Sequence, residues 1–200
     1  PENLRRVIHT PVYSAGDDNR DATSDKPTDR KQKSMKLPIL TALQALVTTF
    51  KLLSGQGEAL AVDLRDFYST LYTILDPNFS KLASLLIVEK NAQLLASALD
   101  VMLVQPRQLP IPRAAAFTKR IMGLAMVVPS PVALSLLKTA YMLLQRHKRA
   151  QQMLDTEQTG LGRFDPLIND PDRANALNST LWELSALHTH EHPAIREFVQ

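Results

Sequence analysis

Three histidines and a glutamate near the end of the chain come closest to a metal-binding or catalytic set. His188, His190 and His192 surround Glu191 in the run HTHEH. On a helix, His188 and His192 would be one turn apart, a spacing that suits zinc. Pro193 disfavours a helical conformation for His192, because a proline restricts the residue before it. We therefore interpret His188 and His190 as residues at the C-terminal end of a helix. Histidines at such an end donate hydrogen bonds to free backbone carbonyl groups and interact favourably with the helix dipole.

Other enzyme signatures are absent from the sequence. The GQG run is too short for a phosphate-binding loop and lacks its lysine, and no G-x-S-x-G motif occurs. The absence of cysteine excludes disulfides, thiolate zinc sites and cysteine nucleophiles. We predict no catalytic residue, no metal and no cofactor. A metal-dependent enzyme that uses the terminal histidines is kept as an alternative.

The charge distribution suggests a phosphate-binding surface. The formal charge of the chain is +3, but the window from Val101 to Leu154 contains no acid and carries +8, while the residues after it carry −5. A region of one sign attracts phosphate. The same cations could instead be solvated side chains or lie near helix C-termini. The candidate residues for binding a nucleic acid or a partner are Arg107, Arg113, Lys119, Arg120, Lys138, Arg146, Lys148 and Arg149.

The elements that must position these residues are helices. From Pro38 onward, apolar residues recur with a period near 3.6, as in Leu43, Leu46 and Phe50, and no strand-type alternation competes. About seven helices are predicted. They run from Pro38 to Ser54, from Asp63 to Asp76, from Phe79 to Val104 as one long or two abutting helices, from Pro112 to Val128, from Ser130 to Leu144, from Asp170 to the histidines, and from Pro193 onward.

The sequence divides into two segments. Residues 1–36 are polar and charged, and we expect them to be flexible because they bury too little apolar surface. Residues 37–200 are predicted to form a helical-repeat domain that belongs to the C-terminal part of a longer chain. Helix pairs of roughly 40 residues favour an all-α, HEAT-like α-solenoid. A compact irregular bundle is the alternative, and no apolar run reaches the roughly 18 residues of a membrane helix.

The last part of the chain contains FDPLINDP and then NALNSTLWELSALHTHEHP. Two Asp-Pro steps are expected to form turns that swing the last helix back onto the array. Trp182, the only tryptophan, is predicted to be a buried core residue, and Glu183 to cap or to pair with Arg120 or another base. The residues interpreted as structural are Asp165, Pro166, Asp170, Pro171, Trp182, Glu183, His190, His192 and Pro193.

These residues also carry a family resemblance. The runs LSGQGEAL, DLRDFYSTLY and PRAAAFTKRI resemble the nucleolar complex protein 3 family, and the terminal motif resembles the end of the domain named after CCAAT-binding factor. The chain departs from that pattern at Glu191, where the family usually has an aromatic residue, and at Phe164, where it often has tyrosine. The resemblance implies a non-catalytic helical-repeat assembly factor that acts in the nucleolus on precursors of the large ribosomal subunit.

The resemblance also implies partners and a location. The expected partners are a member of the nucleolar complex protein 2 family in a heterodimer, pre-ribosomal RNA, large-subunit precursor proteins, and chromatin through a link to replication initiation. No membrane and no small-molecule substrate are expected, and the expected location is the nucleus, in the nucleolus. The alternative is a protein-only helical-repeat binding module, for which the basic window meets solvent or an acidic partner.

Overall fold

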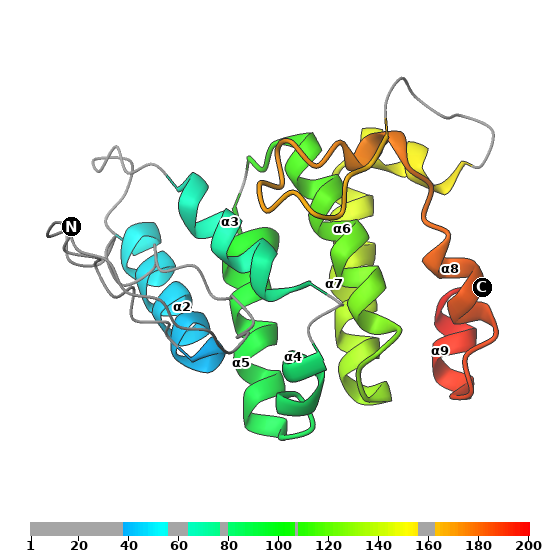
Figure 1. Ribbon diagram of the computed structural model, residues 1–200, viewed down its shortest axis with the longest axis horizontal. Helices are drawn as coiled ribbons and strands as arrows, with labels where there is room; N and C mark the ends of the chain where they lie inside the picture. The colour runs from blue at the N-terminus through cyan, green and yellow to red at the C-terminus, as the bar shows by residue number, and fades with distance from the viewer. Residues whose placement is uncertain (1–37, 56–63, 77–79, 107, 156–162) are drawn as a thin grey trace, which may run out of the picture.

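The computed structural model describes residues 38–55, 64–76, 80–106, 108–155 and 163–200, so the segment 1–36 predicted to be flexible lies outside it. The described residues form helices and turns with no strand among them, which confirms the all-α prediction. The elements are α2 (Ile39–Gly55), α3 (Arg65–Ile74), α4 (Ser80–Leu85), α5 (Glu89–Leu99), the π-helix η2 (Asp100–Val104), α6 (Ile111–Ala125), α7 (Ser130–Arg146), the 3₁₀ helices η3 (Lys148–Leu154) and η4 (Ala176–Asn178), α8 (Glu183–His188) and α9 (Pro193–Phe198) (Figure 1).

The helices lie side by side in two layers (Figure 1). In one layer, α5 and its continuation η2 contact α2 and α7, and α7 contacts α9. In the other layer, α6 packs along α7 and contacts α8, η3 and η4, while α3 contacts α2. This row of neighbouring helices confirms the predicted helical-repeat architecture. Among the described helices, none is long and apolar enough to cross a membrane.

A chain of aromatic rings joins α2, α3 and α6. Phe50 meets Phe67 and Tyr68 edge-on, with ring centroids 5.9 and 5.5 Å apart. Phe117 meets Tyr68 and Tyr72 in the same way, at 6.2 and 5.4 Å. Such pairs contribute about 0.5–1.5 kcal/mol each beyond the burial of the rings. The aromatic chain therefore fixes α3 against α6, although the two helices are distant in sequence.

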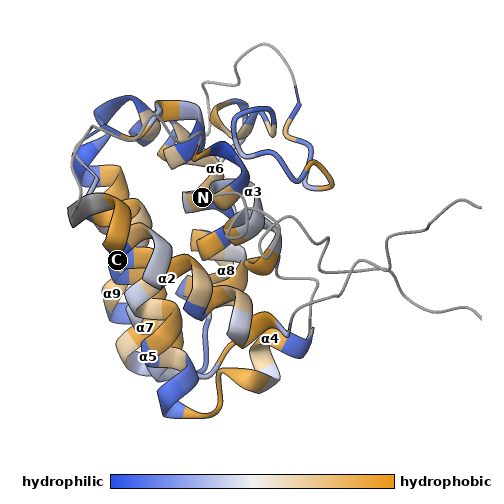
Figure 2. Cartoon of the chain, turned by 90° about the vertical axis from the view of Figure 1, so that its left-hand side faces the viewer, coloured by the Kyte–Doolittle hydropathy of each residue, from blue (hydrophilic) through white to orange (hydrophobic). Residues whose placement is uncertain are grey.

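Apolar periodicity locates most helices, and local chemistry shifts their ends. Pro129 is the N-cap residue of α7, Ser130 is its first helical residue, and Pro131 lies in its first turn. Between α4 and α5 the turn at residues 86–88 separates two helices, which decides between the one long and two abutting helices of the prediction. Hydrophobic residues dominate this turn and α7 (Figure 2).

Helix α5 continues as a π-helix whose carbonyl groups are bonded by side chains. The N–H of Gln105 donates to the carbonyl of Asp100 at 2.8 Å, five residues back. The Tyr68 hydroxyl donates to the carbonyl of Met102 at 3.0 Å, and the Arg146 guanidinium donates to the carbonyl of Val104. A π-helix shifts its carbonyl groups out of the ordinary ladder, and here α3 and α7 supply the donors.

The predicted helix from Asp170 through Trp182 is absent. Residues 163–182 form turns and the short helix η4, and α8 begins only at Glu183. Asn175 has a φ of 54°, in the left-handed region, which a continuous right-handed helix does not contain. We call residues 163–182 the strap.

The two Asp-Pro steps form the turns of the strap, as predicted. A side-chain oxygen of Asp165 accepts from the N–H of Leu167 at 2.9 Å. A side-chain oxygen of Asp170 accepts from the N–H of Asp172 at 3.1 Å. These local bonds compete with a helical ladder, because a short acidic side chain offers its own backbone an alternative partner. The apolar spacing that predicted a helix was therefore overridden by turn chemistry.

Candidate functional site

The basic residues of α6 point into the molecule rather than into solvent. Lys119 and Arg120 are 5% and 4% exposed, and the Arg113 side chain is 12% exposed. A buried cation loses its hydration, so it is stable only with hydrogen-bonded partners. In this fold the partners come mainly from the strap and from α8, which lie across α6.

Arg113 forms a two-pronged ion pair with Asp172 of the strap. Its Nε and Nη2 atoms donate to the two carboxylate oxygens at 3.0 and 2.6 Å. The guanidinium also lies over the ring of Tyr68, 4.3 Å from the centroid. Burial raises the pKa of the Tyr68 hydroxyl, and the positive charge of Arg113 partly opposes that shift. Planar, two-pronged pairing is a geometry that lysine cannot reproduce.

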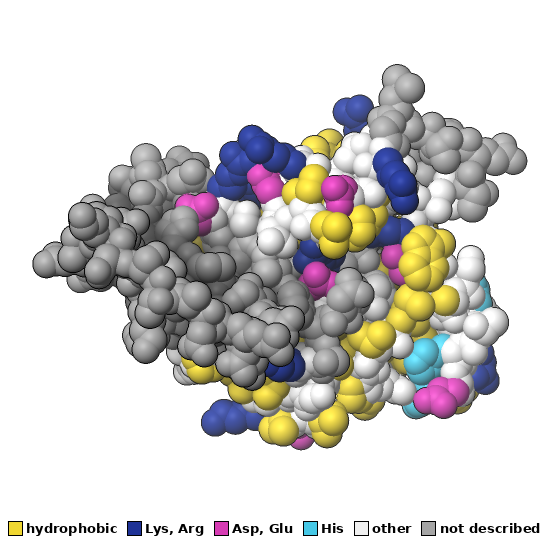
Figure 3. Space-filling view, viewed as in Figure 1, with side chains coloured by type: hydrophobic (Ala, Val, Ile, Leu, Met, Phe, Trp, Pro, Cys, Tyr) yellow, Lys and Arg dark blue, Asp and Glu magenta, His cyan; other side chains and the backbone are white. Residues whose placement is uncertain are grey.

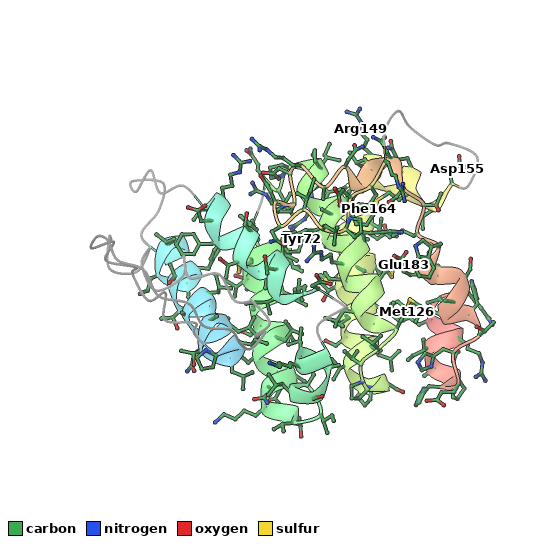
Figure 4. The ribbon with its side chains drawn as sticks, viewed as in Figure 1. Tyr72, Met126, Arg149, Asp155, Phe164 and Glu183 are labelled. Atoms are coloured by element: carbon green, nitrogen blue, oxygen red, sulfur yellow. The ribbon has the colours of Figure 1, made fainter. Side chains whose placement is uncertain are left out.

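Lys119 reaches the boundary between the strap and α8. Its Nζ atom donates to a carboxylate oxygen of Glu183 at 2.9 Å and to the carbonyl of Thr180. It also lies 5.6 Å from the ring centroid of Trp182 and 6.0 Å from that of Phe164. Figure 4 shows Phe164 and Glu183 on the same side of the molecule. The prediction that Glu183 pairs with a base of a preceding helix is confirmed, with Lys119 as the base.

Arg120 joins α3, α6 and the strap through backbone carbonyl groups. Its guanidinium donates to the carbonyl of Tyr72 at 2.6 Å and to that of Pro166 at 2.9 Å. The carboxylate of Asp76 lies 3.8 Å away, and the Tyr72 ring centroid 3.7 Å from the guanidinium carbon. Burial raises the pKa of the Tyr72 hydroxyl, and the charge of Arg120 opposes the shift. One side chain thus holds three elements.

A further ion pair ties the strap to α3. Arg65 at the start of α3 pairs with Asp170, and Arg173 lies 3.6 Å from the same carboxylate. In the space-filling view, basic and acidic side chains lie next to one another on this face, with hydrophobic side chains between them (Figure 3). The three cations of α6, the strap, and the carboxylates of Asp76 and Glu183 therefore form a charge-paired structural clamp, consistent with the structural role predicted for the Asp-Pro steps.

The clamp corrects the predicted basic surface. Arg113, Lys119 and Arg120 are withdrawn from phosphate because their charges are buried and paired within the molecule. Arg146 is exposed, but its guanidinium is bound to the carbonyls of Val104 and Pro106. Lys138, Lys148 and Arg149 are exposed, and Arg107 lies outside the described residues.

Lys138 and Arg149, eleven positions apart in the sequence, do not lie on one helix face. Helix α7 ends at Arg146, and Arg149 belongs to the 3₁₀ helix η3. In Figure 4 the Arg149 side chain projects from the edge of the molecule, away from the helices. The change from α7 to η3 at His147 breaks the regular helical rotation that would bring residues eleven apart onto one face.

The prediction that Trp182 belongs to the core is also wrong, because 58% of its surface is exposed. Trp182 is the N-cap residue of α8, so it precedes the helix on whose inner face it was expected. Leu181 is buried instead, at 4% exposure. The indole ring lies over the Lys119 charge and shields the ion pair from one side, which is a partly wet position that tryptophan tolerates well.

The terminal histidines form a turn between α8 and α9. His188 ends α8 and His192 is the N-cap residue of α9, with Pro193 at its first position, as predicted. The predicted donation from His190 is corrected: its Nδ1 accepts the N–H of His192 at 3.0 Å. Thr189 donates to the carbonyl at the helix end instead. Within the described ranges, no three His, Asp or Glu side chains are grouped as metal ligands.

Sequence reasoning missed Asp172, which anchors the strap, and an exposed apolar area around Tyr141 and Phe198. For Asp172, the only feature of the sequence that could have indicated this role was its position directly after the Asp170–Pro171 step. For Tyr141, the signal was an aromatic residue at the edge of the buried face of α7, one turn from both Leu137 and Leu144.

The fold and the clamp define the class: a helical-repeat protein closed at one end by a charged strap. A family model described as the CBF/Mak21 family matches residues 42–199, and the chain belongs to this family. The chain is 36% identical over 167 residues to the mouse protein named nucleolar complex protein 3 homolog, covering 83% of this chain and 20% of that protein.

Two further relatives bear similar names. The human nucleolar complex protein 3 homolog is 36% identical over 158 residues, covering 78% of this chain and 19% of that protein. The nucleolar complex-associated protein 3 of Arabidopsis thaliana is 31% identical over 182 residues, covering 87% and 21%. The chain thus spans about a fifth of the length of these curated relatives.

Proposed function

We propose that this chain is a non-catalytic scaffold in ribosome biogenesis that works in the nucleolus. The observation that carries the proposal is the likeness to proteins named nucleolar complex protein 3 in mouse and human, and to their plant counterpart, over most of this chain. The geometry supports it, because the charged residues of the strap and α6 are used for internal closure rather than arranged around a reacting centre.

Within that role, the chain binds a partner of the nucleolar complex protein 2 family and contributes to holding a precursor of the large ribosomal subunit. The pairing of Arg113, Lys119 and Arg120 within the molecule leaves few predicted cations for RNA. Protein contacts therefore dominate in this part of the chain, and RNA contact is limited to side chains such as Arg149. The link to replication stays a prediction, since no feature of the described residues favours it.

Depletion and complementation of the full-length endogenous protein test the proposal. Loss of the protein is expected to lower the ratio of large to small ribosomal subunits and to accumulate large-subunit RNA precursors, measured by sucrose gradients and by hybridisation. A tagged full-length copy is expected to restore both and to concentrate in the nucleolus. Normal subunit ratios and precursor RNA after complete depletion would contradict the proposal.

A further inference from the structure

An apolar surface remains open where α7, η3 and α9 meet. Three large side chains are exposed there: Tyr141 by 54%, Leu154 by 50% and Phe198 by 43%. The rings of Tyr141 and Phe198 meet edge-on, with centroids 6.3 Å apart. Beneath them is a pocket of about 310 Å³, lined by Met122, Leu137, Tyr141, Leu144, Gln145, Gln151, Leu154, Leu184, Phe198, Val199 and Gln200. We call this the α7–α9 surface.

Positive charge borders the α7–α9 surface on the sides that α7 and η3 form. Helices α7 and η3 contain no acidic residue. Lys138 lies one helical turn before Tyr141 on the exposed side of α7. On η3, residues three apart share a face, so Lys148 lies on the same side as Leu154, which lines the pocket.

Two acids border the surface as well. Glu197 is exposed and precedes Phe198, and Asp155 is half-buried and follows Leu154. The guanidinium of Arg146 belongs to another part of α7, because it lines a separate small cavity with Met142 and Val104. These acids lie on α9 and just after η3, so a segment that follows α7 and η3 themselves meets the cations Lys138 and Lys148 and no acid.

We propose that the α7–α9 surface docks an acidic amphipathic helix of a partner protein. Apolar side chains of that helix enter the pocket between Tyr141, Leu154 and Phe198, at spacings of three and four residues. Its Asp or Glu side chains face Lys138 and Lys148. Contiguous exposed apolar side chains rimmed by polar residues are typical of protein interaction sites. The inference rests on the proposed scaffold function and names the docking face and the chemistry of its partner.

RNA fits this surface less well than a helix does. The lining of the pocket is mainly apolar and includes the leucine side chains Leu137, Leu144 and Leu184. These offer no hydrogen bond to a base edge and no charge to a phosphate. Arg149, the cation best placed for RNA, lies on the other face of η3 from Leu154, because it is one residue past Lys148.

Site-specific photo-cross-linking of the full-length protein tests the inference. With Tyr141→p-benzoylphenylalanine in nuclear extract, we expect a cross-link to one protein segment, which mass spectrometry identifies. That segment is expected to have apolar residues at helical spacing and a net negative charge. A cross-link to RNA, to a neutral or basic segment, or to the same chain would overturn the inference. Val127→p-benzoylphenylalanine, at a residue 52% exposed but outside the pocket lining, is the matched control and is expected not to capture the segment.

Charge reversal gives a second, independent readout. Lys138→Glu with Lys148→Glu is expected to reduce the cross-link about tenfold, while Lys90→Glu, exposed at the start of α5, leaves it unchanged. Replacing the acids of the captured segment with lysine is expected to restore the cross-link to the reversed variant. An undiminished cross-link would contradict the charge complementarity. Melting curves check folding, and Lys138→Gln with Lys148→Gln replaces the reversed pair if it melts lower.

The two proposals fail in distinguishable ways. If depletion leaves the ribosomal subunits normal but the acidic helix is captured, the docking surface stands and the biogenesis role fails. If subunits are lost on depletion but the captured segment is not acidic, the biogenesis role stands and the docking inference fails.

Discussion

The Nζ atom of Lys119 lies 2.9 Å from a carboxylate oxygen of Glu183, and both side chains are only 5% exposed. The pair joins the middle of α6 to the start of α8, across 64 positions of sequence. Because neither group has bulk water to replace its partner, the two charges depend on each other.

Removing one member of this pair is expected to be costly. Lys119→Met leaves the Glu183 carboxylate buried without its main cation, and should lower the free energy of unfolding by about 3–5 kcal/mol. The double variant Lys119→Met with Glu183→Leu should recover most of that loss, because no unpaired charge remains. Denaturant unfolding measures both. Lys138→Met, on the exposed side of α7, is the control. Equal destabilisation by Lys119→Met and by the control would refute the dependence.

The exposure of Trp182 reverses the expected order of two neighbouring truncations. Leu181→Ala should destabilise by about 2–5 kcal/mol, since Leu181 is buried and the substitution leaves a cavity. Trp182→Ala should cost about 1 kcal/mol, from its half-covered ring and its contact with the Lys119 charge. Thermal melting of both variants tests the order. A larger loss for Trp182→Ala would mean that the indole is buried in solution.

The RNA affinity of the full-length protein should depend on the charge of Arg149. The charge of Arg113 should not contribute to it directly. Arg149→Glu is expected to reduce the slope of log affinity against log salt by about one, as for the loss of one phosphate contact. Arg113→Glu should instead unfold the clamp, because it places a second acid against Asp172. Titrations at several salt concentrations, with melting curves for each variant, separate the effects. An unchanged slope for a folded Arg149→Glu variant would favour the protein-only module.

Acidification should weaken the end of α7 through His147. Burial, and then the positive charge of Arg146, lower the pKa of His147 below the ordinary value of 6.5. Between the lowered folded pKa and the unfolded pKa, the unfolded chain binds more protons, so stability falls as the pH falls below about 6.5. His147→Gln should lose less stability than wild type between pH 8 and pH 5. Parallel denaturation curves at both pH values measure the difference, and identical losses would disprove it.

The helices of this protein could be predicted from sequence because their signals are local. Apolar periodicity placed α2 and α7 nearly to the residue, and Pro193 placed the start of α9. Such signals act over a few residues, and tertiary contacts in these segments agree with them. The same holds for the two Asp-Pro turns of the strap.

The clamp could not be predicted, because its partners are far apart in sequence. Arg113 and Asp172 are separated by 59 positions, and Arg65 and Asp170 by 105. The sequence alone does not distinguish a lysine or arginine that is solvated from one that is buried against a carboxylate. The prediction that Trp182 is buried was wrong for a related reason. Turns replaced the predicted helix, whose periodicity would have directed the indole ring inward.

The position of the strap has a consequence for synthesis of the chain. When α6 leaves the ribosome, its buried cations still lack the carboxylates and carbonyls of residues 165–183, which are translated about fifty residues later. At roughly 5–20 residues per second, that gap lasts some seconds. During this interval α6 is a basic helix beside the RNA of the translating ribosome. The nascent domain therefore completes its packing only when its last part emerges, and a chain stopped before Asp165 is expected to be a target for chaperones.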